Sequence, residues 1–79
     1  MIPNLAATSV VMNLVWDKYP GAKIEWTKKS NSQDVTVKAS ALVNSQPLHG
    51  RATENMHELL TKPNGPKELA DKLLEQMDK

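Results

Sequence analysis

Cysteine is absent from the 79-residue chain. A disulfide framework, a cysteine-ligated zinc site and a cysteine nucleophile are therefore excluded. In so short a chain this favours a reducing compartment, and we expect a cytoplasmic protein. The apolar run at 5–16 has no basic residue before it and is too short to span a bilayer, so we expect no contact with a membrane.

Phenylalanine is also absent, and the chain has only two tryptophans and one tyrosine. We expect Trp16 and Trp26 to be the large core side chains. The three glycines are isolated from one another, which argues against a glycine-rich phosphate loop. The formal net charge is +1, so a charged site must be a local patch. The length predicts one domain over residues 1–79, with a core that is only just sufficient.

Residues 34–43 carry the clearest pattern in the chain. Apolar and polar residues alternate there with period two, which predicts a half-buried strand. Its buried face includes Ala39 and Ala41, small enough for a helix to approach closely. Residues 22–28 alternate in the same way and predict a partner strand, with Trp26 opposite Val35 and Ile24 opposite Val37. The predicted outer face of this hairpin is polar and consists of Lys23, Glu25, Thr27, Thr36, Lys38 and Ser40.

Three helices flank the predicted strands. The first runs from about Leu5 to Lys18, begins at Pro3 or Asn4 and ends before Pro20. The second is capped by Thr53 and reaches Leu60. The third follows the turn residues at 62–65 and runs from Pro66 to Met77. Residues 48–52 are either a short third strand or a loop after a turn near 45–47. We therefore expect an α+β domain in which the N-terminal helix packs on a two- or three-stranded antiparallel sheet, in the order α-β-β-(β)-α-α.

The order of helix, strands and helix resembles, in topology alone, that of double-stranded-RNA-binding domains. That family has a cluster of lysines at the start of its last helix. Here the corresponding residues are Pro66, Lys67 and Glu68, followed by Asp71. The feature that carries the family's function is absent, so the resemblance assigns no membership.

Two groups of residues are candidates for chemistry. Glu54 and His57 have a spacing that can present a carboxylate and an imidazole to one metal ion on a helix. His49 could serve as a general base for Ser40 or Ser45. Neither group belongs to a larger motif, and ordinary surface residues explain both. We therefore expect no catalytic residue, no bound metal and no cofactor.

The first predicted helix is apolar around most of its circumference. If the sheet covers Met12, Val15 and Trp16, then Val10 and Leu14 face the other way and need a second cover. The C-terminal helices could provide it, or a second copy of the chain or another protein could. We predict a non-catalytic binding or regulatory module that works through protein–protein contact, either with another protein or with a second copy of the chain in a homodimer. The predicted partner-binding residues are Val10, Leu14, Lys28 and Lys29.

A basic patch on the hairpin supports an alternative function. Several lysines lie in or beside the two predicted strands, and an arginine joins them if residues 48–52 form a third strand. Such a patch can follow a phosphate backbone. The alternative is therefore an RNA- or DNA-binding domain whose contacts come from Lys23, Lys28, Lys29, Lys38 and Arg51.

Overall fold

The computed structural model describes residues 5–78, so the caps predicted at positions 3 and 4 lie outside it. The chain is an α+β fold with one antiparallel sheet in the strand order β1-β2-β3. The elements are α1 (Leu5–Lys18), β1 (Lys23–Lys28), β2 (Asp34–Val43), β3 (Gln46–Asn55), α2 (Met56–Thr61) and α3 (Gly65–Met77). The expected fold class and element order are confirmed.

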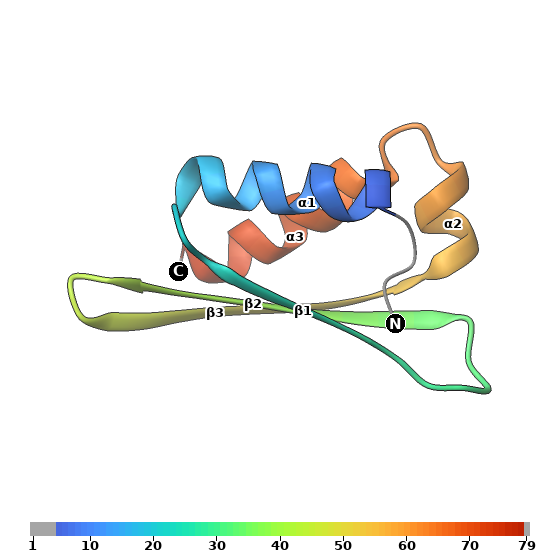
Figure 1. Cartoon of the computed structure of the whole chain (residues 1–79), viewed down its shortest axis with the longest axis horizontal. Coiled ribbons are helices and arrows are strands. Elements are labelled where there is room, and N and C mark those ends of the chain that lie inside the picture. The colour runs from blue at the N-terminus through green and yellow to red at the C-terminus, as the bar shows by residue number, and fades with distance from the viewer. Residues whose placement is uncertain (1–4, 79) are drawn as a thin grey trace.

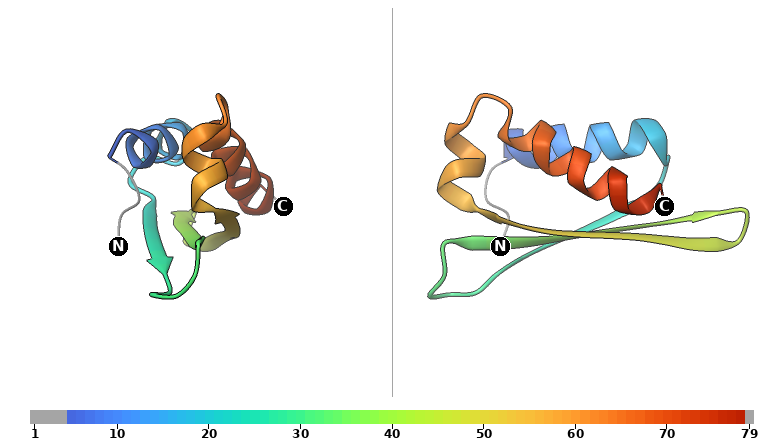
Figure 2. Two further views of the ribbon diagram at one scale, coloured as in Figure 1. Left: turned by 90° about the vertical axis from the view of Figure 1, so that its right-hand side faces the viewer. Right: turned by 180° about the vertical axis from the view of Figure 1, so that it is seen from behind.

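The three helices lie on one face of the sheet (Figures 1 and 2). α3 packs over β3 and alongside α1, while α2 lies at the end of the sheet where β3 ends. The other face of the sheet is not covered by any part of the described chain. The fold therefore has two layers, one of helices and one of strands.

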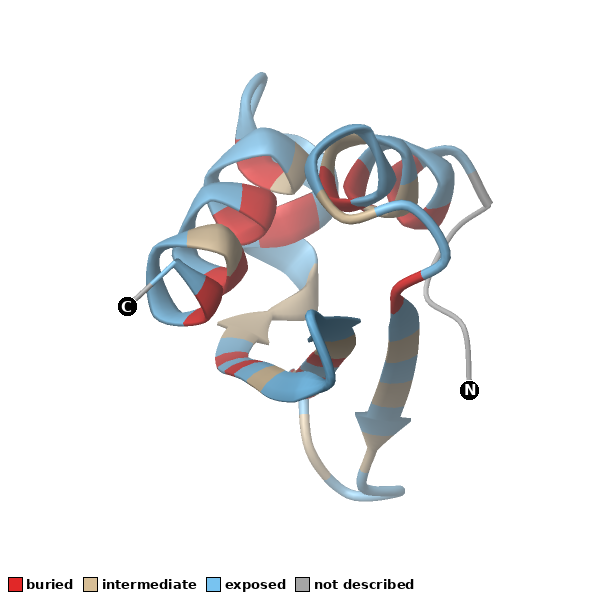
Figure 3. Cartoon of the chain, turned by 90° about the vertical axis from the view of Figure 1, so that its left-hand side faces the viewer, coloured by how far each residue is buried: buried red, intermediate tan, exposed pale blue. Residues whose placement is uncertain are grey.

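The hydrophobic core lies between these layers, and Figure 3 shows buried segments alternating with exposed ones along helices and strands. The strands contribute their period-two inner faces, as the sequence pattern predicts. The helices contribute one stripe each. The largest fully buried side chains are Val11, Val15, Val35, Val37, Leu59, Leu69, Leu73 and Met77.

Trp16 does not belong to the core, contrary to the prediction. Its side chain is 43% exposed, and its indole Nε1 donates a hydrogen bond to the carbonyl oxygen of Ala22 at 2.6 Å. Trp26 is half-buried and packs against the core from β1. The buried stripe of α1 runs instead through Ala7, Val11 and Val15. This stripe faces both the sheet and α3, which turns Trp16 to the rim.

The register of the first hairpin differs by two residues from the predicted one. Trp26 pairs with Val37 rather than Val35, and Ile24 pairs with Ala39. The loop at 29–33 is correspondingly longer than expected, and the Ser32 hydroxyl accepts a hydrogen bond from the Asp34 amide inside it. Because the shift is an even number, each side chain keeps its predicted face.

Residues 48–52 form a third strand, one of the two alternatives predicted for them, and β3 extends beyond them at both ends. The β2–β3 connection is a two-residue turn at Asn44 and Ser45, both with positive φ, as in the tight hairpins that match strand twist. The strand then continues to Asn55, so the predicted cap at Thr53 is wrong. Asn55 caps α2 instead, because its side chain accepts a hydrogen bond from the Glu58 amide.

α3 approaches the sheet closely over β3, beside the small inner face predicted for the central strand. Ala39 pairs with Gly50 of β3, and a Cβ atom on Gly50 would lie 2.6 Å from the carbonyl oxygen of Leu73. The helix backbone therefore approaches the sheet at a position that only glycine accommodates without movement. This contact positions α3 over β3.

Candidate functional site

The uncovered face of the sheet is built from cross-strand rows of polar side chains. In one row, Glu25 of β1, Lys38 of β2 and Arg51 of β3 are neighbours, and in the next row Lys23, Ser40 and His49 are neighbours. We call this surface the open face. Alternation along the strands directs these side chains away from the helices, which fixes their place on one side.

Three cations form a diagonal band across the open face, one from each strand. Lys38 and Arg51 are direct Cα partners, and Lys23 lies one diagonal step away on β1, a separation of about 7–8 Å in a sheet. All three line an open depression of about 400 Å³, together with Glu25, Ser40 and His49. The structure thus brings together three of the five basic residues of the alternative prediction.

The remaining two basic residues of that prediction are placed differently. Lys29 lies in the β1–β2 loop and lines a second depression on the open face with Thr36, Lys38 and Arg51. Lys28 is on the helix-facing side of β1, half-buried, and its Nζ donates a hydrogen bond to the Lys29 carbonyl oxygen. Lys28 is therefore not part of the open face.

The cationic band is not neutralised by ion pairs within the described residues. The three ion pairs found there join Lys18 to Asp78, Lys67 to Asp71 and Lys72 to Glu54. All three involve a residue of α1 or α3 or the C-cap of α3. The side chains of Lys38 and Arg51 thus remain available to a ligand.

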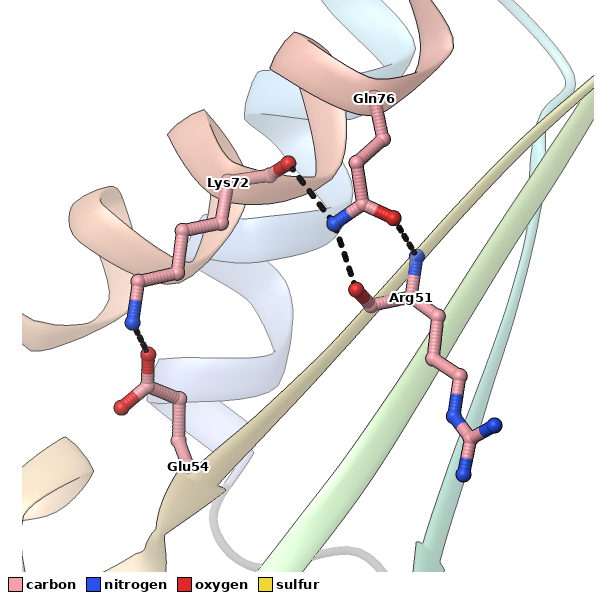
Figure 4. Close-up of polar contacts among 4 residues, drawn as sticks. All are labelled: Arg51, Glu54, Lys72 and Gln76. Atoms are coloured by element: carbon pink, nitrogen blue, oxygen red, sulfur yellow. Dashed lines mark hydrogen bonds and ion pairs between the residues drawn. The ribbon is translucent and has the colours of Figure 1, made fainter.

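α3 holds the outer edge of β3 by a side-chain clamp (Figure 4). Gln76 Oε1 accepts a hydrogen bond from the Arg51 amide at 2.9 Å, and Gln76 Nε2 donates one to the Arg51 carbonyl oxygen at 2.5 Å. The backbone amide and carbonyl groups of Arg51, at the free edge of β3, are thereby hydrogen-bonded as a neighbouring strand would bond them. The guanidinium of Arg51 points away from α3 (Figure 4), so the clamp leaves its charge on the open face.

A second surface is the end of the β2–β3 hairpin, which extends past the helices (Figures 1 and 2). Leu42 is 76% exposed and Val43 is 39% exposed there. We call this surface the hairpin end. The sequence prediction missed it, although a signal was present: Leu42 follows Thr36, Lys38 and Ser40 at an outer-face position where a polar residue is usual.

A third surface contains one of the predicted partner-binding residues. Val10 of α1 and Leu60 of α2 are 42% and 44% exposed and line a shallow groove of about 270 Å³ with Pro63 and Pro66. Leu14, the other predicted apolar residue, is half-buried and packs against the core. α3 covers much of the helix surface that the sequence left without a partner, so Leu14 and Val10 do not form one patch.

The candidates for chemistry are also separated or occupied. Glu54 is in β3 and pairs with Lys72, whereas His57 is exposed on α2, so the predicted helical spacing does not exist. Within residues 5–78 no cluster of three or more acidic or histidine side chains could hold a metal ion. Ser40 and His49 are Cα partners on the open face, but no hydrogen bond between their side chains is found in that range.

No protein family, curated protein or solved structure matches this chain. Among the helices in the described part of the chain, none has the length and apolar character needed to cross a membrane. Function must therefore be inferred from the three surfaces of the chain itself.

Proposed function

We propose that the protein is a small non-catalytic binding module that acts through protein–protein contact, and that the hairpin end is its main contact surface. The observation that carries this proposal is the exposure of Leu42, whose exposed fraction is 76%. Its Cα partner Pro47 is also exposed, so Leu42 belongs to a small apolar patch on this projecting hairpin rather than standing alone.

The geometry of the hairpin end suits contact with another protein. The hairpin projects from the body of the molecule, so a partner can reach both of its faces (Figure 1). Leu42 lies on the side of the open face and Val43 on the opposite side, because successive residues of a strand alternate. The tight turn at Asn44 and Ser45 keeps these side chains on a stiff support, which lowers the entropy lost on binding.

The proposal includes self-association as one form of the contact and a cytoplasmic location, which rests on the cysteine-free composition. The shallow groove lined by Val10 and Leu60 is a secondary candidate surface, and it supports the same class of function. Val10 and Leu60 come from different helices and are both exposed, which is the arrangement that the predicted partner-binding role of Val10 requires.

A photo-crosslinking amino acid placed at position 42 tests the proposal in cells. We expect a discrete protein adduct, either a dimer of the chain or a complex with another protein. The same amino acid at position 67, on an exposed part of α3, is the matched control and should give no adduct of that size. In parallel, light scattering should show whether the mass exceeds the 8.8 kDa of one chain.

Leu42→Ser provides the mutational arm. Because the side chain is exposed, the free energy of unfolding should stay within about 0.5 kcal/mol of the parent value. A crosslinker moved to the neighbouring position 43 of this variant should no longer give the adduct, and any dimer mass should be lost. Val10→Ser is the companion variant for the second surface. Failure to obtain any protein adduct from position 42, with a monomer mass at all concentrations, would contradict the proposal.

A further inference from the structure

The open face has a property that the proposed function does not use. Lys38 and Arg51 are direct partners in neighbouring strands, and like charges at directly opposite positions destabilise a sheet. Glu25 is the neighbour of Lys38 on the other side, yet no ion pair joins them within residues 5–78. Without such an ion pair, Glu25 offsets the repulsion between the two cations only in part, so their pairing keeps a cost in folding.

The charges around the band come from the three strands and from the β1–β2 loop. The open face and its adjoining loop carry four cations, Lys23, Lys29, Lys38 and Arg51, and two anions, Glu25 and Asp34. The open face and its loop therefore have a net charge of +2. The whole chain has a net charge of +1, so the rest of the chain is net negative. Positive charge is concentrated on the side that the helices leave uncovered.

We infer that the open face binds the phosphate backbone of a nucleic acid. The three cations of the band come from three strands and are spread over an uncovered face, which suits an extended polyanion better than a small enclosed ligand. The depression they line is open, and hydroxyl and imidazole groups of Ser40 and His49 lie beside them as further partners for phosphate oxygens.

The composition of the open face also predicts the type of recognition. None of the three aromatic residues of the chain lies in its cross-strand rows: Trp16 and Tyr19 precede β1, and Trp26 is on the helix-facing side. Stacking on bases is therefore not available, and stacking is what aromatic side chains add in single-strand recognition. Binding should be independent of base sequence and should depend steeply on salt.

Fluorescence anisotropy with a labelled DNA duplex of mixed sequence tests this inference. We expect a dissociation constant of about 10⁻⁶–10⁻⁴ M near physiological salt. If the three cations of the band neutralise three phosphates, log K should fall with log salt concentration with a slope of about −2.7. A second duplex of unrelated sequence should bind equally well, and single-stranded DNA and RNA probes then show which form is preferred.

Two charge variants locate the contact. Lys38→Gln and Arg51→Gln should each reduce the salt slope by about 1. Each should also leave the melting temperature unchanged or higher, because the like-charge contact is removed. Lys67→Gln, which removes an exposed charge on α3, is the matched control and should keep the full slope.

Several results would overturn the inference. These are no binding at low salt, an unchanged slope in both variants, or an equal loss in Lys67→Gln. Displacement of the duplex by polyglutamate at the same charge concentration as by unlabelled duplex would also overturn it, because any polyanion would then suffice. Val43→Ser, at the hairpin end but on the side opposite the open face, should bind the duplex normally. Failure of this inference and failure of the proposed protein contact can therefore be told apart.

Discussion

At Gly50 the two layers of the fold approach each other closely. The backbone of α3 lies where a side chain at this position would be, with the Leu73 carbonyl oxygen 2.6 Å from an ideal Cβ. Neither backbone can yield easily, because β3 is paired with β2 and α3 is packed on the core. A glycine in a strand is otherwise unfavourable, so close approach explains its presence.

Gly50→Ala should therefore destabilise the protein by about 1–3 kcal/mol, the usual cost of overpacking. Chemical denaturation followed by circular dichroism measures this loss. His49→Ala, at the exposed neighbouring position on β3, is the control and should change stability by less than about 0.5 kcal/mol. Equal stability of Gly50→Ala and the parent would show that α3 can move away from the sheet without cost.

At the scale of elements, the ends of α1 and α3 are joined through Asp78. Its carboxylate accepts hydrogen bonds from Lys18 Nζ and from the Tyr19 hydroxyl. These two hydrogen bonds hold the pKa of Asp78 below its ordinary value of 3.8, and the bond to Asp78 raises the pKa of Lys18. The groups are exposed, so the contribution to stability is small.

The pH dependence of this contact has a defined direction. Because the pKa of Asp78 is lower in the folded state, its contribution is complete above about pH 4, the ordinary carboxyl range. It is then lost as the pH falls through the folded-state value. Asp78→Asn should lower the melting temperature slightly at neutral pH, and the difference from the parent should shrink in acid.

Thermal unfolding of the two proteins between pH 7 and pH 2 measures this difference. Asp71→Asn removes a carboxylate whose ion-pair partner, Lys67, lies within α3, and it controls for the loss of one negative charge. If the difference in melting temperature between Asp78→Asn and the parent stayed constant down to the lowest pH, the Asp78 carboxylate would not link α1 to α3.

For the whole molecule, stability depends on one shared core. A 79-residue domain is expected to be stable by only about 4–12 kcal/mol. Leu73 is fully buried in the core cluster and belongs to α3, which contacts α1, α2 and β3. Loss of a single large side chain from α3 should therefore affect helices and strands together.

Leu73→Ala should cost about 2–5 kcal/mol and leave much of the protein unfolded near physiological temperature. Far-ultraviolet circular dichroism reports the helices, and tryptophan fluorescence reports Trp26 in β1 and Trp16 at the end of α1. The two signals should change at the same denaturant concentration, as in two-state unfolding. Leu60→Ala, at an exposed position, should leave both transitions in place.

The sequence was sufficient for features that depend on local periodicity. Alternation assigned the faces of β1 and β2 correctly, and the breakers at 20–21 and 62–66 separated the helices from their neighbours. Local signals were less reliable for residue types that are common both at helix caps and in strands. Thr53 resembles a helix cap, yet it lies in β3 because pairing with Thr36 continues the ladder to Asn55.

The tertiary structure alone decided which residues meet. Packing of α3 beside α1 buried Val11 and Val15 and left Trp16 at the rim, because a helix apolar on most sides does not reveal which side a neighbour will take. Sheet register placed Lys38 directly opposite Arg51 and put Lys23 one diagonal step away, which forms the cationic band. Such contacts between distant segments depend on pairing and packing, whereas periodicity records only the side of an element on which a residue lies.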